Sequence, residues 1–189
     1  MRTAFAVLLL AAVASVAAAP QVARPFTIQR LGGTPNVKVE TLRGKIVVLA
    51  FVSTTCPHCQ ELTKELVAMS KEYSQRGVQF LECAMNPEAE HDLPNFIRQL
   101  QVPFPVGFSD REKVYAFVGR SAVDNRMFYV PHLVFIDRNG MVRGDYPGES
   151  DFIAHAAENT RTELDKLLKP AAPGAAAAGA PKTSTTGKQ

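Results

Sequence analysis

The chain has 189 residues, of which 46% are hydrophobic and 21% charged, a composition typical of one globular domain with short extensions. Its formal net charge of +3 comes from the two ends, because Arg2, Lys182 and Lys188 lie there and leave 18 basic against 18 acidic residues in the body. The chain has no Trp, no basic stripe and no set of aromatic residues suited to stacking on bases. These features argue against nucleic acid as a partner.

The first 19 residues have the pattern of an export signal. Arg2 precedes a wholly apolar run from Ala4 to Val13, and the small residues from Ser15 to Ala19 offer cleavage sites. An uncleaved, weak membrane anchor is the alternative, since roughly 17 apolar residues are near the lower limit for a membrane span. Contact with a membrane is expected only in that case. We therefore expect an exported, periplasmic or extracytoplasmic protein, where cysteine pairs can persist oxidised.

The other end of the chain predicts a tail without a core. Residues 170–189 consist mainly of Ala, Gly, Pro, Thr and Lys, which cannot bury enough apolar surface to fold. Residues 20–169 remain as one predicted domain of about 150 residues.

The first half of this domain predicts a short extension and a β–α–β unit. Residues 26–41 are expected to form the extension, with short strands. Residues 45–52 are continuously apolar and β-branched, as in a buried central strand. Apolar side chains at steps of three and four predict a helix over residues 57–76, which Gly77 can cap. Residues 78–85 predict a second strand, parallel to the first.

An insertion separates this unit from the second half of the domain. Its pattern predicts a helix at 93–101, a strand at 104–108 and a helix at 111–118. The second half has a clearer sequence pattern. Two predicted strands at 132–137 and 141–146 flank Asn139-Gly140, the signal of a tight antiparallel turn. A helix is expected over 149–169. The expected fold is therefore α/β, with a mixed sheet between helices.

The motif Cys56-Pro57-His58-Cys59 lies at the junction between the first strand and its helix. The free N–H groups and the dipole at a helix start favour a thiolate at Cys56. Pro57 suits the first helical turn, and an imidazolium at His58 would favour the thiolate further, so both are expected to tune the acidity of Cys56. We expect Cys56 to be the nucleophile and Cys59, one turn deeper, to be the resolving thiol.

Two other interpretations of the cysteine pair are weaker. A structural disulfide between them would close a loop too short to contribute much stability. A zinc site would need a second pair of Cys or His at ligand spacing, but His91, His132 and His155 are scattered singly. Cys83 stands alone within a predicted strand, where cysteine usually acts as a small buried hydrophobic residue. No metal and no cofactor is therefore expected.

Three segments carry a resemblance to a known family. They are residues 47–59, the turn Asn86-Pro87-Glu88, and the run of residues 130–140, Val-Pro-His-Leu-Val-Phe-Ile-Asp-Arg-Asn-Gly. Across residues 26–169 the chain resembles the TlpA/ResA-like branch of the thioredoxin superfamily, exported thiol-disulfide oxidoreductases with an N-terminal hairpin and an insertion. The resemblance implies a thioredoxin-like fold. It also implies that Pro131 is a cis-proline facing the cysteines and that Val130 offers backbone groups to an extended segment of the substrate.

The chain departs from the family in two places. Thr55 stands before the first cysteine, where family members usually have Trp. Ala50 stands where thioredoxins proper carry a buried acid that accepts the proton of the resolving cysteine. Glu61, Glu65 or Glu82 could replace that acid, although each is expected to be solvated, because charged side chains are seldom buried.

The function expected from the motif and the resemblance is thiol-disulfide exchange with protein substrates. The direction stays open, because Pro-His between the cysteines is shared with oxidising members while the rest resembles reducing ones. The resemblance also implies apocytochromes or general envelope proteins as substrates and a membrane-bound electron donor or acceptor. Two alternatives remain. One is a thiol peroxidase, whose Pro-x-x-x-Thr-x-x-Cys signature would need Pro and Thr where the chain has Leu49 and Ser53. The other is a copper-binding chaperone that uses Cys56, Cys59 and His58 or His132 as soft ligands.

Overall fold

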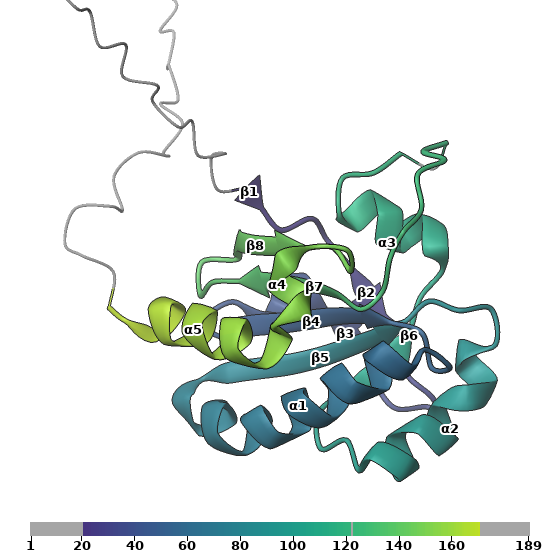
Figure 1. Cartoon of the computed structure of the whole chain (residues 1–189), viewed down its shortest axis with the longest axis horizontal. Helices are drawn as coiled ribbons and strands as arrows, with labels where there is room; N and C mark the ends of the chain where they lie inside the picture. The colour runs from purple at the N-terminus through teal and green to yellow at the C-terminus, as the bar shows by residue number, and fades with distance from the viewer. Residues whose placement is uncertain (1–20, 122, 171–189) are drawn as a thin grey trace, which may run out of the picture.

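The structure is a computed structural model that describes residues 21–121 and 123–170 (Figure 1). The predicted signal at 1–19 lies outside these residues, as does the predicted tail at 170–189 apart from its first residue. Within the described part of the chain, no helix is long and apolar enough to cross a membrane.

A six-stranded mixed sheet forms the centre of the molecule. Its strands lie in the order β1-β8-β7-β4-β5-β6, and β4, β5 and β6 are parallel while β7, β8 and β1 alternate in direction. Their bounds are β1 Gln21–Val22, β4 Ile46–Val52, β5 Val78–Ala84, β6 Val106–Phe108, β7 His132–Ile136 and β8 Met141–Tyr146. A separate hairpin pairs β2, Thr27–Ile28, with β3, Val37–Lys38. The predicted mixed sheet and N-terminal hairpin are thus confirmed.

Helices cover both faces of this sheet. They are α1 Pro57–Tyr73, α2 Ala89–Leu100, α3 Arg111–Phe117, α4 Asp151–Ala154 and α5 Ala156–Leu168, with short 3-10 turns at Val39–Leu42 and Ser74–Arg76. Helices α1 and α5 lie side by side on one face (Figure 1), and α3 packs against the opposite face.

The central strand β4 belongs to two cores at once. All seven of its residues are buried, and alternate side chains point to opposite faces because the strand has a period of two. Val48, Ala50 and Val52 pack with α1 and α2, whereas Leu49 and Phe51 pack with α3 and the N-terminal segment. The sheet is therefore a rigid platform, and the motif begins four residues after β4 ends.

Two helices differ from their predicted extents. Helix α2 begins at Ala89, four residues earlier than predicted, and contains Pro94. Pro94 cannot donate to the carbonyl of Glu90, but Glu90 is exposed and water can solvate that group. The predicted helix 149–169 is interrupted at His155, where the Phe152 carbonyl accepts from the His155 N–H at 3.4 Å and from the Asn159 side chain at 3.0 Å.

Candidate active site

The end of β4 and the start of α1 position Cys56. It is the capping residue before α1, Pro57 occupies the first helical turn, and the Cys56 N–H donates to the carbonyl of Ser53 at 3.2 Å. Cys56 is partly exposed, whereas Cys59, one turn along the helix, is completely buried. Both are free thiols. The expected arrangement of an outer and an inner sulfur at a helix start is therefore present.

Val130 and Pro131 lie directly opposite Cys56. The peptide bond between them is cis, and the Cys56 Sγ atom is 4.0 Å from the Val130 carbonyl oxygen. Pro131 is buried just before β7, while Val130 is half-buried. The structure thus brings together four residues singled out in the sequence, from two segments about 70 positions apart: Cys56, Cys59, Val130 and Pro131.

The environment of Cys59 opposes its ionisation. Burial raises the pKa of the Cys59 thiol far above its usual range, and the neighbouring Cys56 and Glu82 raise it further. The Ser53 N–H opposes these effects, because it donates to the Cys59 Sγ atom at 3.4 Å and favours a thiolate there. At rest Cys59 is therefore a protonated thiol, and it needs a base before it can attack another sulfur.

A hydrogen-bond network holds the loop before Cys56 in place. Thr54 is buried, and its hydroxyl donates to Asp92 at 3.0 Å. Asn86 bonds both the main chain and the side chain of Thr54, and Gln60 donates to the Thr54 carbonyl at 2.9 Å. Sequence reasoning noted Asn86 only as part of a turn and missed the other members. The signal available was a run of Ser and Thr at a strand end, followed by an Asn-Pro turn after the next strand.

Two grooves meet at Val130. One, of about 660 Å³, runs past His58, Glu61, Pro131 and the α4 region. The other, of about 680 Å³, lies between Ser53, the turn after β5 and the start of α3. Pro57 and His58 are exposed at the rim. An extended peptide can therefore pass Cys56 through both grooves.

The three candidate acids fall in different environments. Glu61 is exposed and Glu65 is half-buried on α1, where burial raises the pKa of Glu65. Glu82 is completely buried in β5, so the expectation that it is solvated is wrong. Burial raises the pKa of Glu82 to about 8. The neighbour of Glu82 in the sheet is Ala50, which stands where thioredoxins proper carry the buried acid.

His132 and Cys83 lie in surroundings typical of residues that stabilise the fold. His132 is buried, stacks on Phe128 at 4.9 Å between ring centres, and bonds Asp145 through its Nε2 atom. Cys83 is buried on the opposite face of the sheet from Cys59, as expected for a small hydrophobic residue. Among residues 21–121 and 123–170, no three His, Cys, Asp or Glu side chains converge as a metal site would require.

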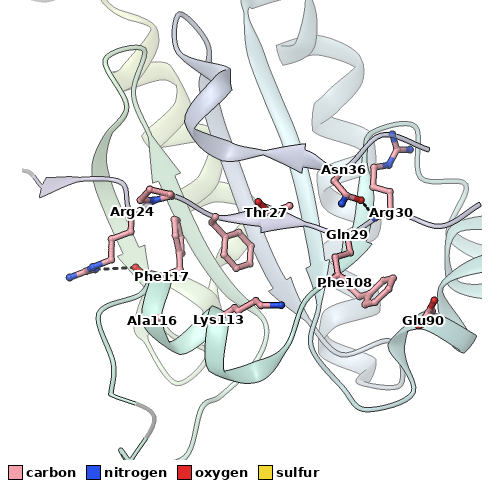
Figure 2. A pocket seen from close by; sticks show the side chains of 12 residues that line it. Arg24, Thr27, Gln29, Arg30, Asn36, Glu90, Phe108, Lys113, Ala116 and Phe117 are labelled. Atoms are coloured by element: carbon pink, nitrogen blue, oxygen red, sulfur yellow. Dashed lines mark hydrogen bonds between the residues drawn. The ribbon is translucent and has the colours of Figure 1, made fainter. Parts of the chain in front are cut away.

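A larger depression, of about 710 Å³, lies between the N-terminal hairpin and α3 (Figure 2). Its lining contains no Cys or His. Arg24 donates to the Phe117 carbonyl at 3.0 Å, and Asn36 accepts from the Arg30 N–H at 3.0 Å, so these polar groups stabilise the hairpin. Val130, whose carbonyl oxygen lies 4.0 Å from the Cys56 sulfur, lines the two smaller grooves.

Comparisons with known proteins agree with this geometry. The model of the AhpC/TSA family matches residues 19–144. Thiol-disulfide oxidoreductase ResA of Bacillus thuringiensis (strain Al Hakam) is 24% identical over 148 residues, which cover 78% of this chain and 75% of that protein.

Solved structures show the same architecture. A thiol:disulfide interchange protein of the thioredoxin family from Chlorobium tepidum TLS has a TM-score of 0.60 and 25% identity, covering 78% of this chain and 99% of that one. The thioredoxin domain of a thiol-disulfide oxidoreductase from Bacteroides vulgatus has a TM-score of 0.63 and 17% identity, covering 79% and 96%. These likenesses confirm the thioredoxin-like fold.

Proposed function

The chain belongs to the AhpC/TSA family, and from this premise we propose that it is an exported thiol-disulfide oxidoreductase that exchanges disulfides with protein substrates. The observation that carries the proposal is the place of the Cys56 sulfur. It is partly exposed at the start of α1, 4.0 Å from the Val130 oxygen, with the buried Cys59 one turn behind it. The relative named thiol-disulfide oxidoreductase ResA supports the same chemistry.

The exchange has two steps when the protein acts as a reductase. The Cys56 thiolate attacks one sulfur of a substrate disulfide, a bond forms between Cys56 and that sulfur, and the other substrate sulfur leaves as a thiolate. Cys59 then loses its proton and attacks the Cys56 sulfur, so that the second substrate sulfur leaves. The substrate gains two electrons, and the protein ends with a Cys56–Cys59 disulfide. As an oxidase, the protein runs the same steps backwards.

The two grooves suit a substrate in an extended conformation. Val130 lines both of them, and its carbonyl oxygen lies 4.0 Å from the Cys56 sulfur. Backbone atoms at this point can orient the substrate without reading its side chains, which fits an enzyme that serves several proteins. We propose that the substrate disulfide is presented to Cys56 beside Val130 and Pro131.

The cellular setting is also part of the proposal. The apolar segment at 1–19 supports export, and a reactive cysteine pair outside the cytosol needs a source or a sink for two electrons. We propose a membrane-bound donor or acceptor for that role, with apocytochromes or general envelope proteins as substrates.

Single-cysteine variants test the exchange. Reduced Cys59→Ser protein, mixed with a disulfide-containing protein such as insulin, is expected to accumulate a mixed disulfide through Cys56 that dithiothreitol releases. Cys56→Ser is expected to form none, and Cys83→Ser is the matched control with both active cysteines intact. Adducts on Cys56→Ser but not on Cys59→Ser would reverse the roles. Adducts on neither variant, with no insulin reduction by the unaltered protein, would reject the function.

A peroxide assay separates exchange from peroxide reduction. Leu49 and Ser53 occupy the positions where the peroxidase signature has Pro and Thr, and Leu49 is completely buried in β4. We therefore expect peroxide consumption far slower than insulin reduction at equal protein concentration. Faster peroxide consumption would favour the thiol peroxidase.

A further inference from the structure

Glu82 is the most unusual charged residue of the described structure. It lies in the middle of β5 and is completely buried. Within the described residues, neither of its carboxyl oxygens has a hydrogen-bond partner. A buried ionisable group without a partner costs free energy, so its retention calls for a reason other than stability.

Strand geometry places Glu82 on the same face as Cys59. Side chains alternate along β5, and Phe80 and Ala84, two positions away on either side, both pack in the core beneath α1. Cys59 belongs to that same core. Cys83, the next residue in the strand, points to the other core.

The groups around Glu82 leave Cys59 as its titratable neighbour. Ala50 of β4 and Val106 of β6 flank it in the sheet, and Ala89, Leu93 and Phe96 of α2 belong to the same core. From α1 come Cys59 and Thr63, and the Thr63 hydroxyl already donates to the Cys59 carbonyl at 2.9 Å. The charge of Glu82 acts on Cys59, as the rise in the pKa of Cys59 records.

We propose that Glu82 is the internal proton acceptor of Cys59 during the resolving step. The inference rests on the proposed exchange function and assigns one further residue to it. When Cys59 attacks the Cys56 sulfur of the mixed disulfide, its proton passes to the Glu82 carboxylate, a Cys59–Cys56 bond forms, and the substrate sulfur leaves as a thiolate. In the opposite direction, protonated Glu82 returns the proton to Cys59 as the internal disulfide opens.

The acid–base properties of Glu82 suit this role. A general base works best when its pKa lies near the working pH, because it is then both available and strong enough. Burial raises the pKa of Glu82 to about 8, which brings a carboxyl group close to that condition. An exposed carboxylate would be too weak a base for a buried thiol.

The two steps can be followed separately with a chromogenic aromatic disulfide, dithiobis-nitrobenzoate, because each thiolate that it releases is coloured. Attack by Cys56 on this reagent releases one coloured thiolate, and attack by Cys59 on the resulting mixed disulfide releases a second. With the full-length reduced protein, we expect Glu82→Gln to leave the first release unchanged within about twofold. The second release should slow by at least about tenfold near pH 7, since general bases commonly contribute more than this. Glu82→Asp should restore part of the rate.

Glu163→Gln is the matched control. Glu163 is only 7% exposed, and its Oε1 atom also lacks a partner within the described part of the chain, but it lies on α5. The Glu163→Gln substitution should leave both releases unchanged. An unchanged second release in Glu82→Gln, or equal slowing of both releases, would overturn the inference while leaving exchange intact. Absence of the first release from the unaltered protein would instead reject the proposed function itself.

The pH profile of the unaltered protein gives a second measurement that needs no variant. The second release should rise with pH and level off near pH 8, as the carboxyl loses its proton. Continued growth of about tenfold per pH unit above that point would show that Cys59 ionises without Glu82, and would overturn the inference.

Discussion

Asn86 holds the loop that carries Cys56 through two hydrogen bonds to Thr54. Its Oδ1 atom accepts from the Thr54 N–H at 3.0 Å, and its Nδ2 group donates to the Thr54 hydroxyl at 2.9 Å. Asn86 lies two residues after the end of β5, and Thr54 lies two residues after the end of β4, so the Asn86 side chain joins the two parallel strands just where the active site begins. The position of Cys56 therefore depends on a residue 30 positions further along the chain.

Replacing Asn86 by Ala should weaken both the fold and the site. Thr54 is buried, and its N–H would lose its partner, which costs about 1–3 kcal/mol. We expect a lower urea midpoint and a slower reaction of Cys56 with a chromogenic disulfide. Asn95→Ala is the control, because Asn95 is exposed on α2 and should change stability by less than about 0.5 kcal/mol. Equal effects of the two substitutions would show that Asn86 has no special role.

The placement of the two sulfurs could be predicted from the sequence because it is local. The motif Cys56-Pro57-His58-Cys59, the strand before it and the helix after it are consecutive, so the placement of one outer and one inner sulfur follows from helix geometry. The surroundings could not be predicted in the same way. That Glu82 faces Cys59 depends on the pairing of β4 with β5, which is set by packing across the sheet.

The secondary structure likewise contains elements that the sequence predicts and elements that it does not. Strands β4, β5, β7 and β8 agree with the predicted segments to within one or two residues, because long apolar runs and an Asn-Gly turn mark them. The two-residue strand β1 was missed, since its pairing with β8 gives no pattern along the sequence. The interruption at His155 was missed as well, because Ile153, Ala156 and Ala157 keep the apolar spacing of one continuous helix across it.

Replacing His58 by Gln should make the cysteine pair slightly more reducing. His58 lies exposed on the first turn of α1, and an imidazolium there favours the thiolate of the reduced form. Because exposed charges contribute less than about 1 kcal/mol, the reduction potential should fall by no more than about 20 mV.

Equilibration with glutathione measures this shift. Lys64→Gln is the control, because it removes a positive charge from an exposed position further along the same helix. A shift of equal size in the two variants would exclude a specific role for the imidazole.

Glu82 should make the fold less stable as the pH rises from about 5 to 8. The pKa of Glu82 is about 8 in the folded protein against 4.5 for an unburied glutamate, so between these values the folded state holds a proton that the unfolded state has lost. Each pH unit then costs the folded state up to about 1.4 kcal/mol. Glu82→Gln lacks this proton, and its free energy of unfolding should fall less over the same range.

Urea unfolding at pH 5, 6.5 and 8 measures the difference. Asp92 and Asp124 do not disturb the comparison. Hydrogen bonds, from His91 to Asp92 and from Arg126 to Asp124, lower the pKa of each carboxyl below 3.8, so their contributions are lost only in more acidic solution. Parallel pH profiles for the unaltered protein and Glu82→Gln would contradict a neutral, buried Glu82.

Arg120 holds the segment that leads to Val130 in place through several contacts. Its guanidinium lies 4.6 Å from the Tyr115 ring centre and 5.5 Å from that of Phe128, and its Nε atom donates to Asp124 at 2.9 Å. It also donates to the Met127 carbonyl at 3.2 Å. A planar group with donors on several sides makes all these contacts at once, which an ammonium group cannot do.

Arg120→Lys should therefore loosen this segment although the charge is kept. We expect a loss of roughly 1–3 kcal/mol in stability, because the hydrogen bonds to Asp124 and to the Met127 carbonyl are removed together. Since Phe128 stacks on His132, which follows Pro131, the KM for a protein substrate should rise more than that for a small disulfide. Arg126→Lys is the control, as the Arg126 side chain is 78% exposed and its ion pair with Asp124 contributes little. Equal rises in KM for large and small substrates would place the effect of Arg120 on Cys56 itself instead of the surface that binds protein substrates.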